Sequence, residues 1–355
     1  MTLEQLGWTE EREPEWDSHR LREKGLRARV IASNRNVAQV LTETQHLQGH
    51  IPGLGSRLEG YPTVGDWCII APPQENSTQT RILSILTRRN QIRRKKAGKA
   101  TAPQVLACNV DRALLLTSRG PEFNQNRIDR YLTMIRSDEI EPIICLTKTD
   151  LDEDWKTTEA EVQSEYPEIR VFSISATTGF GLDRLSEILE TSQTSVLLGS
   201  SGVGKSTLTN RLLNQHQRDT QSVRENDGKG RHTTSNSLMF HIPDLGWLID
   251  APGIREIEPW DANSGIDENF AKIKVLAQNC RFRECSHDRE KGCAVQAALS
   301  QGLVSPRVLG NYRRIIREQT LQDLKADRKS MNEKKRRDKS LAKDLRRIIN
   351  HKNNR

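Results

Sequence analysis

The amino-acid sequence predicts an α/β domain preceded by a small β-barrel and followed by a mainly helical region with a metal site. Three observations predict this order. Short β-rich runs occupy residues 30 to about 100, apolar strands alternate with amphipathic helices from about 103, and three cysteines and a histidine cluster in the polar region after about 257. At 355 residues the chain is also too long for one average domain.

Residues 30–100 are expected to form a small antiparallel barrel or sheet. The runs RARVIASNRNVAQVLTE, TVGDWCIIAPP and QTRILSILTRR are rich in strand-forming residues and are separated by Gly, Pro and Asn clusters. The segment PTVGDW is typical of a turn that leads into a strand, with Gly65 and Asp66 at the bend. The preceding residues 1–29 are highly charged with helix-like stretches, and we expect a mobile arm there.

Residues 101–258 alternate strands with helices, which predicts a mainly parallel sheet covered on both faces. The expected strands are VDRALLLTS, EPIICLTKTD, IRVFSISATTG, SVLLG and LGWLIDAPG. The expected helices are NQNRIDRYLTMIRSDE, DWKTTEAEVQSEY, GLDRLSEILETS and STLTNRLLN. Short polar motifs stand at the ends of several of these strands.

The segment Gly199 to Ser206 reads G-S-S-G-V-G-K-S, a full match to the phosphate-binding pattern G-x-x-x-x-G-K-[ST]. An apolar strand precedes it and a helix follows, so backbone N–H groups and the helix N-terminus point at one anion. Lys205 can reach the β and γ phosphates, and the Ser206 hydroxyl can coordinate Mg²⁺. The residues expected to contact the nucleotide here are Gly199, Ser200, Ser201, Gly202, Val203, Gly204, Lys205, Ser206 and Thr207.

The segment WLIDAPG supplies a second part of the expected phosphate site. Asp250 ends a strand and can hold Mg²⁺ through water, while Gly253 can offer its N–H to a γ-phosphate. Alone, D-x-P-G also fits an ordinary turn. Beside a phosphate loop, it favours a magnesium nucleotide site.

The segment TKTD, residues 147–150, predicts guanine as the base. Asp150 can accept both N1–H and N2–H of guanine, a pair of donors that adenine lacks, and the stem of Lys148 can pack over the base. The SAT segment adds Ser175 and Ala176, whose backbone N–H groups can reach guanine O6. Each motif alone also fits a polar turn. Their order is unusual, because the base-reading motifs precede the phosphate loop.

Cys280, Cys285, His287 and Cys293 follow the spacing C-x₄-C-x-H-x₅-C. Three thiolates and one imidazole match a closed tetrahedral Zn²⁺ site, one per chain and structural in role. Free cysteines are the alternative. The scattered Cys68, Cys108 and Cys145 sit in apolar surroundings and are expected to be buried thiols.

Positive charge is concentrated in two segments. Residues 321–355 contain 13 Lys and Arg against 5 Asp and Glu, which accounts for the whole net charge of +8. Residues 88–99 add seven basic residues and no acidic one. Both segments favour a polyanion as partner, although the tail also fits a solvated helix.

Taken together, these residues resemble the circularly permuted GTPases of the RsgA (YjeQ/YloQ) type, which assist biogenesis of the small ribosomal subunit. The base-reading motifs precede the phosphate loop in that family, as they do here. The resemblance runs over nearly the whole chain. It is carried by PTVGDW at 62–67, APQVLACNVDRALLL at 102–116, RIDRYL at 127–132, GSSGVGKSTLTN at 199–210, GKGRHTTS at 228–235, DAPGIRE at 250–256 and the Cys/His cluster.

The resemblance implies a GTP hydrolase that yields GDP and phosphate, binds the 30S subunit and its 16S rRNA, and is stimulated by it during late maturation. It also implies a monomer. The N-terminus of the chain is acidic and polar, which predicts no secretory signal. No apolar run approaches the ~18 residues of a membrane span. A cytoplasmic protein is therefore expected. The expected parts are a charged arm (1–29), an RNA-binding OB-fold barrel (30–100), the permuted GTPase domain (101–258), a zinc-binding domain (259–320) and a basic helical tail (321–355).

Hydrolysis has to proceed without the glutamine that many GTPases place after D-x-x-G, because Ile254 stands there. The resemblance makes His232 the candidate for positioning water, although a plain surface histidine is the alternative. Thr233 or Thr234 could complete the Mg²⁺ shell. One departure from the family pattern N-K-x-D is Thr147, where asparagine is usual.

Two other functions fit parts of the sequence. A nucleic-acid-binding module could use GTP only to gate binding, and the phosphate loop alone also permits an ATPase or kinase. Turnover stimulated by the small subunit separates the first from a GTPase, and a GTP/ATP comparison separates the second.

Overall fold

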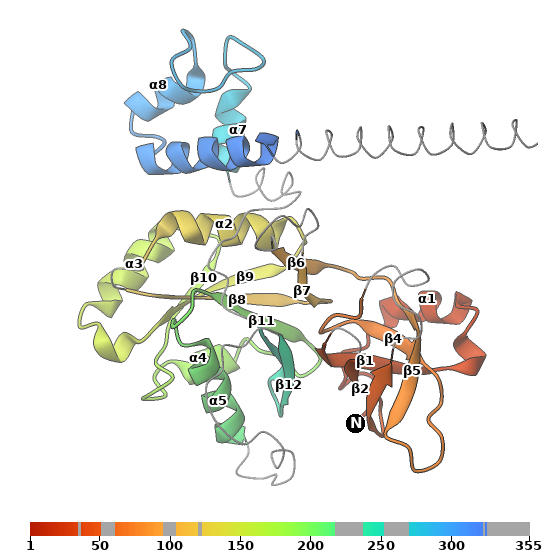
Figure 1. Ribbon diagram of the computed structural model, residues 1–355. Coiled ribbons are helices and arrows are strands. Elements are labelled where there is room, and N and C mark those ends of the chain that lie inside the picture. Colours follow the sequence, from red (N-terminus) through yellow and green to blue (C-terminus); the bar gives the residue numbers. More distant parts are fainter. Residues whose placement is uncertain are drawn as a thin grey trace, which may run out of the picture. The chain divides into compact units, whose positions relative to one another are not determined.

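The computed structural model describes residues 1–34, 37–50, 61–94, 104–119, 123–216, 237–251, 270–321 and 324 (Figure 1). The chain divides into two compact units, Met1–Asn269 and Phe270–Arg355.

The first unit begins with a closed five-stranded barrel. Its strands are β1 (Leu26–Ser33), β2 (Val37–Leu41), β3 (His46–His50), β4 (Trp67–Ile70) and β5 (Gln79–Ile85). They follow the order β1-β2-β3-β5-β4, and β4 pairs back onto β1 to close the barrel. The pair β3–β5 is parallel and the other pairs are antiparallel. This arrangement confirms the predicted OB-type barrel.

Alternating side chains fill the barrel, as the two-residue repeat of a strand requires. Ala28 and Val30 of β1, Ala38 and Val40 of β2 and Ile82 of β5 all point into its core. Small residues on β1 and β2 leave room for larger ones opposite, which is how a narrow barrel is packed.

The N-terminal segment differs from the mobile arm expected at residues 1–29. It forms η1 (Glu10–Arg12), α1 (Glu13–Ser18) and η2 (Arg22–Lys24), and β1 already begins at Leu26. Leu6, Trp8 and Trp16 are buried, and Trp8 packs edge-on against Trp67 with ring centroids 4.8 Å apart. The segment is held because these apolar side chains, scattered among charges, join the main core.

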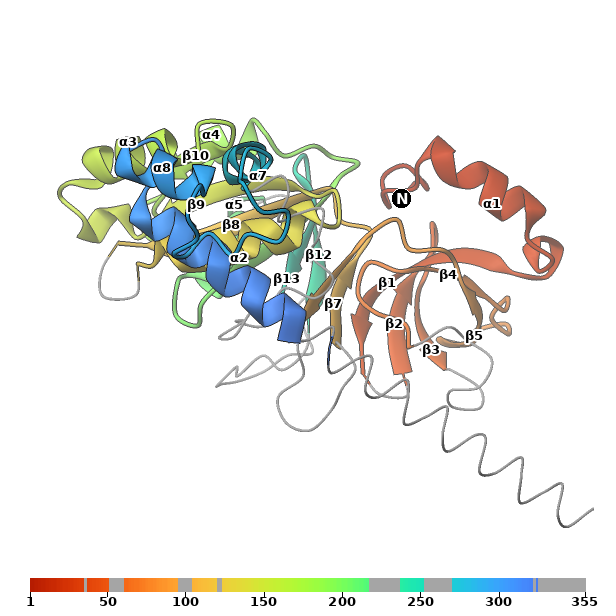
Figure 2. The same cartoon turned by 90° about the horizontal axis from the view of Figure 1, so that it is seen from above.

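The α/β sheet has the strand order β10-β9-β8-β11-β13-β12. The first five strands are parallel and β12 is antiparallel to β13. The strands are β8 (Arg112–Ser118), β9 (Glu141–Thr147), β10 (Arg170–Ser173), β11 (Thr194–Gly199), β12 (Leu238–Ile242) and β13 (Gly246–Asp250). β12 also pairs with β1 through Ala32 and Leu238, so this sheet continues into the barrel (Figure 2).

Helices cover both faces of this sheet, as predicted (Figure 1). One face carries α2 (Gln125–Arg136) and α3 (Trp155–Glu165), and the other carries α4 (Leu182–Ser186) and α5 (Lys205–His216). The short helix η3 (Thr149–Leu151) follows β9.

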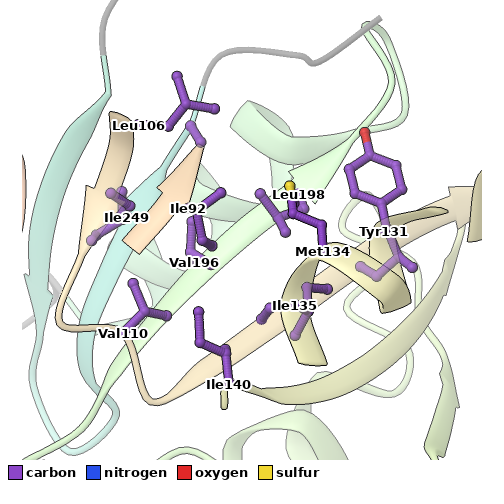
Figure 3. Close-up of a cluster of buried hydrophobic side chains, with 14 of the residues drawn as sticks. Ile92, Leu106, Val110, Tyr131, Met134, Ile135, Ile140, Val196, Leu198 and Ile249 are labelled. Atoms are coloured by element: carbon purple, nitrogen blue, oxygen red, sulfur yellow. The ribbon is translucent and has the colours of Figure 1, made fainter. Parts of the chain in front are cut away.

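A two-stranded hairpin, β6 (Gln91–Arg94) with β7 (Gln104–Cys108), lies over the α2 side of the sheet. Ile92 and Leu106 from this hairpin join Met134 and Ile135 of α2 in one buried cluster against β11 and β13 (Figure 3). The core therefore reaches directly beneath the strand that leads into the phosphate loop.

The second unit is small and helical over its described part. It contains α7 (Ala271–Ala277), α8 (Ala294–Ser300) and a helical stretch at 306–321. Between α7 and α8 the chain forms turns without regular secondary structure, and these turns carry the Cys/His cluster.

Candidate nucleotide site and metal cluster

The phosphate loop runs from the end of β11 to the start of α5, as the sequence predicts. Gly199, Gly202 and Gly204 have φ angles of +150°, +80° and +109°, in the region that favours glycine. A Cβ on Gly199 would lie 2.6 Å from the carbonyl oxygen of Leu116, whereas a Cβ on Gly202 or Gly204 would meet no atom within 4 Å. Gly199 is thus required for packing, while the other two keep space open along the loop.

Lys205 is already held above this loop. Its Nζ donates to the carbonyl oxygens of Gly199 at 3.0 Å and Ser200 at 2.8 Å. Burial lowers the pKa of Lys205, while the nearby Asp250 opposes that shift. The ammonium group is therefore fixed at the mouth of the loop, where its charge is poorly solvated and available to an anion.

Asp250 stands at the end of β13, in register with Leu197 of β11. Its carboxylate accepts a hydrogen bond from the Ser206 hydroxyl at 3.2 Å. Burial raises the pKa of Asp250, although Ser206 and Lys205 both favour the ionised form. A hydroxyl and a carboxylate side by side offer the oxygen ligands that Mg²⁺ prefers.

The base-reading segment follows β9, two strands away from β11 in the sheet. Lys148 adopts a left-handed conformation with φ +61°, and the chain then turns outward so that Asp150 is exposed. The Asp150 carboxylate accepts a hydrogen bond from the Ser175 hydroxyl at 2.5 Å, and Ser175 is fully buried. The two motifs, TKTD and SAT, are therefore joined, and one carboxylate oxygen of Asp150 is held in place.

This contact gives Ser175 a role that sequence reasoning missed. The sequence predicted only that the backbone N–H groups of Ser175 and Ala176 contact the base. The Ser175 hydroxyl also accepts from the Thr178 N–H at 3.1 Å, which fixes the turn after β10. A serine at a strand end, opposite an aspartate at the neighbouring strand end, is the signal that could have revealed the pair.

Thr147 connects the base-reading segment to the phosphate loop. Its hydroxyl lies 2.7 Å from the Val203 carbonyl oxygen and 3.2 Å from that of Thr117. Since a hydroxyl has one hydrogen, the shorter contact with Val203 is the stronger bond. Threonine thus supplies a donor at the position where the family has asparagine.

The remaining predicted site residues divide into two groups. Ser200 is half-buried, and Ser201 and Thr207 are exposed around the loop, while Val203 is buried against the α5 side of the sheet. The other predicted residues lie outside the described part of the chain: His232, Thr233, Thr234 and Gly253.

The Cys/His cluster brings together all four predicted ligands. The ligand atoms of Cys280, Cys285, His287 and Cys293 lie within 4.8 Å of one another and could hold a metal ion. His287 Nδ1 lies 3.6 Å from the Cys280 sulfur and 3.5 Å from the Cys293 sulfur, and these two sulfurs are 3.8 Å apart. The imidazole therefore presents Nδ1 to the thiols.

Backbone N–H groups and a carboxylate shape this cluster. Partial burial opposes ionisation of Cys280, yet the N–H groups of Val295 and Ala294 lower its pKa overall. The Glu290 carboxylate accepts from the backbone N–H groups of Ser286 and Asp288 at 2.8 and 2.9 Å and so organises the turn around His287. Glu290 was not predicted from the sequence, because a glutamate in a charged loop carries no distinct pattern.

The basic segment at 88–99 is less available to a polyanion than its charge suggests. Arg88 forms a bidentate ion pair with the fully buried Asp66, through Nε at 2.8 Å and a terminal nitrogen at 2.7 Å. Arg89 pairs with Asp111 at 2.5 Å. These two arginines stabilise the junction of the barrel and the α/β sheet, and the described residues of the tail are only Leu321 and Leu324.

Comparison with known proteins identifies the family. The family model described as RsgA GTPase matches residues 85–260. The small ribosomal subunit biogenesis GTPase RsgA 2 of Vibrio parahaemolyticus is 37% identical over 323 residues, which cover 89% of this chain and 86% of the relative. The chain belongs to the RsgA GTPase family. It is therefore a GTP hydrolase.

Other relatives and solved structures agree with this family. The small ribosomal subunit biogenesis GTPase RsgA of Methanosarcina acetivorans is 36% identical over 323 residues, covering 90% of this chain and 86% of the relative. The crystal structure of YloQ, a circularly permuted GTPase, is 25% identical, with a TM-score of 0.59 over 84% of this chain and 96% of that one. The structure of YjeQ from Thermotoga maritima gives the same TM-score of 0.59 over 83% and 98%.

The sheet topology explains how this RsgA-family chain accommodates the inverted order of its motifs. Sheet pairing places the ends of β9 and β11 at one edge, so the base reader and the phosphate loop meet whichever comes first in the sequence.

Within the described residues, the helices are all too short or too polar to cross a membrane.

Proposed function

We propose that this RsgA-family chain binds GTP between the TKTD segment and the phosphate loop, and hydrolyses it to GDP and phosphate during late maturation of the small (30S) ribosomal subunit. The observation that carries this proposal is the hydrogen bond from Thr147 to Val203, because it fixes the base-reading strand against the phosphate loop. Relatives named as small ribosomal subunit biogenesis GTPases support the biological setting.

Base and phosphates are recognised by different chemistry. Asp150, oriented by Ser175, accepts the two N–H groups of the guanine edge, while the Lys148 stem covers the ring and Ala176 offers its N–H to O6. At the other end, Lys205 and the loop N–H groups surround the phosphates. Specificity for guanine and affinity for phosphate are thus carried by two separate segments.

Mg²⁺ is expected between Ser206 and Asp250. Their 3.2 Å contact marks where the hydroxyl and carboxylate oxygens converge, and a bound magnesium ion would neutralise charge on the phosphates. Thr233 or Thr234 is proposed to complete the magnesium shell, Gly253 to donate to the γ-phosphate, and His232 to position the attacking water. One of these threonines, with Gly253 and His232, carries the part of the proposed mechanism that responds to the γ-phosphate.

For the Cys/His cluster we propose one structural Zn²⁺ ion. A tetrahedral zinc with Zn–S near 2.3 Å and Zn–N near 2.0 Å separates two sulfurs by about 3.8 Å, and a sulfur from a nitrogen by about 3.5 Å. The separations in this cluster, 3.8 Å between sulfurs and 3.5–3.6 Å to nitrogen, fit that geometry. Four protein ligands leave no open position, so the ion serves the fold and not catalysis.

The proposed partner is the 30S subunit and its 16S rRNA, contacted by the OB-fold barrel and by the basic tail. The tail, residues 321–355, carries the whole net charge of +8, so binding should weaken as salt concentration rises. We propose five parts for the chain, acting as a cytoplasmic monomer. They are the N-terminal segment to about residue 25, the barrel from Leu26 to about 100, the GTPase domain at 101–258, the zinc domain at 259–320 and the tail at 321–355.

Hydrolysis measured with GTP and with ATP, each with and without purified small subunits, tests this function. We expect turnover of GTP only, raised several-fold or more by the subunits, and abolished in Lys205→Ala. Equal turnover of ATP would favour an ATPase or kinase instead. GTP turnover that the subunits leave unchanged would favour a nucleic-acid-binding module in which GTP only gates binding.

A further inference from the structure

Two aromatic side chains connect the two base-reading segments, TKTD and SAT. Trp155 is the first residue of α3, which follows TKTD, and Phe180 ends the turn that begins with SAT. Their rings meet edge-on, with centroids 4.9 Å apart and 60° between the planes. Phe180 is 44% exposed and Trp155 is half-buried, and neither ring belongs to the two large cores of the sheet. The pair is therefore a surface contact between the segments that read the base.

The backbone of the turn sets the direction of Phe180. Its carbonyl oxygen accepts from the Ser175 N–H at 3.0 Å, and the Gly179 N–H donates to the Ser175 carbonyl at 2.9 Å. Gly181 follows with φ +72°, where a Cβ would lie 2.2 Å from a backbone carbonyl oxygen, so only glycine fits. The chain can thus turn tightly enough to set an exposed phenylalanine against Trp155.

Trp155 is held on its own side by Asp152. The Trp155 N–H donates to the Asp152 carbonyl oxygen at 3.3 Å. The Asp152 carboxylate accepts from the Thr158 hydroxyl at 3.3 Å and from Arg119 at 3.2 Å. Arg119 follows β8, the strand between β9 and β11 (Figure 1). The start of α3 is therefore tied to the sheet only two residues after Asp150.

These contacts close a ring that includes the base-reading carboxylate. Asp150 accepts from the Ser175 hydroxyl at 2.5 Å, and Ser175 is bonded through its N–H to Phe180. Phe180 packs on Trp155, from which the chain leads back through η3 to Asp150. The β9–β10 ladder ends before either segment begins. Contacts outside the ladder, a buried polar one and an exposed aromatic one among them, therefore set the distance between the segments.

We propose that Trp155 and Phe180 are positioning residues for guanine specificity: their contact holds the Asp150 carboxylate and the Ala176 N–H at the separation that one guanine edge requires. This inference rests on the proposed function, in which those two groups read the base. The rings act through these groups and not on the nucleotide itself. Without the pair the two segments can move apart, and a base then makes one contact at the expense of the other.

The experiment measures Kd for GDP and for inosine diphosphate in the full-length chain. The inosine base keeps O6 and N1–H but lacks the 2-amino group, so it takes only one hydrogen bond from Asp150 and depends less on the position of that carboxylate. Phe180→Ala should raise Kd for GDP by about threefold to tenfold, the value of one aromatic pair, and Kd for inosine diphosphate by no more than about twofold.

Two controls accompany this variant. Phe180→Tyr keeps the ring edge and should restore both wild-type Kd values. Phe282→Ala removes a phenylalanine of similar exposure, 50%, from the second unit and should change neither Kd.

A second variant tests whether the two rings act as one contact. Trp155→Ala should match Phe180→Ala, and the double variant should bind GDP no more weakly than either single one, because the same contact is removed once. Should Phe180→Ala not fold, Trp155→Ala carries the comparison of GDP with inosine diphosphate.

Three outcomes would overturn the inference. Wild-type Kd for GDP in Phe180→Ala would remove the role of the pair. Equal weakening of GDP and inosine diphosphate would mean general loosening of the site, and additive losses in the double variant would mean that the rings act separately. A wild-type chain that binds ADP as tightly as GDP would instead contradict the proposed base reading itself, whatever the two rings do.

Discussion

The nucleotide site and the Cys/His cluster are built on opposite principles. The nucleotide site stands on the ends of parallel strands whose side chains fill two large cores, and its hydrogen bonds are already formed by protein groups alone. The cluster lies in a unit whose helices α7 and α8 have seven residues each, and its ligands come from irregular turns. The first site is preformed by burial of apolar surface, whereas we propose that the second depends on its ion.

This difference follows from what each site has to do. A nucleotide site must release GDP and accept GTP, so its framework has to persist while the ligand leaves. A closed set of three thiols and one imidazole has no ligand to exchange, and we propose that its ion reinforces the small core formed by residues such as Ile273, Val295 and Ile315. Breaking either site should therefore have distinct consequences.

The largest effect is expected from removing the metal. A zinc-selective chelator, or Cys285→Ser, should make residues 270–321 sensitive to protease, because the apparent binding energy of a structural zinc is on the order of 10 kcal/mol. Arg283→Ala, an exposed change between two ligands, is the control and should leave the segment protected. Protection that survived full loss of metal would show that the segment folds by itself.

The next largest effect is expected at Asp150. Replacing it by asparagine removes two charge-assisted hydrogen bonds to guanine, so GDP affinity should fall by roughly a hundredfold or more. Xanthine carries an oxygen where guanine has its amino group, so the amide of Asp150→Asn should bind xanthosine diphosphate better than the wild type does. The exposed Glu153→Gln is the control. Unchanged guanine preference in Asp150→Asn would refute the base-reader assignment.

A smaller effect is expected at Thr147. In Thr147→Val the Val203 carbonyl loses its buried donor, and GDP should bind roughly fivefold to fiftyfold more weakly. Thr147→Asn should retain most of the affinity. Thr149 is a matched control two residues on, because its buried hydroxyl has no hydrogen-bond partner among the described residues. Equal losses in Thr147→Val and Thr149→Val would mean that the contact with the loop is unimportant.

Much of this architecture could be predicted from the sequence, because its signals are local. Turn residues and two-residue alternation predicted the barrel, and strand–helix alternation predicted the parallel sheet. The G-S-S-G-V-G-K-S segment and the four metal ligands needed only spacing. The structure places these segments where the patterns indicated.

The misses came from long-range contacts. Nothing near Trp8 or Trp16 in the sequence indicates that Trp67 lies against them, so residues 1–29 looked mobile. By sequence Arg88 belongs to a basic cluster that favours RNA, but in the fold it pairs with the buried Asp66, 22 positions earlier in the chain. Charge counts record how many arginines there are, and only the fold shows which of them are already paired.

The same reason explains what the sequence left open at Thr147. Its hydroxyl donates to the phosphate loop from an element that is distant in sequence, 56 positions from Val203. A hydroxyl in an apolar strand or helix carries no pattern of its own. Its hydrogen-bond partner can be identified only from the folded structure.

The account is tested most directly by the affinity of the full-length chain for GDP, with and without its metal, at constant Mg²⁺. A preformed nucleotide site in a separate unit predicts that Kd for GDP stays within about twofold after metal removal, as expected for independent sites. A loss of tenfold or more, about 1.4 kcal/mol, would contradict it and show that the nucleotide site is built only when the metal cluster is intact.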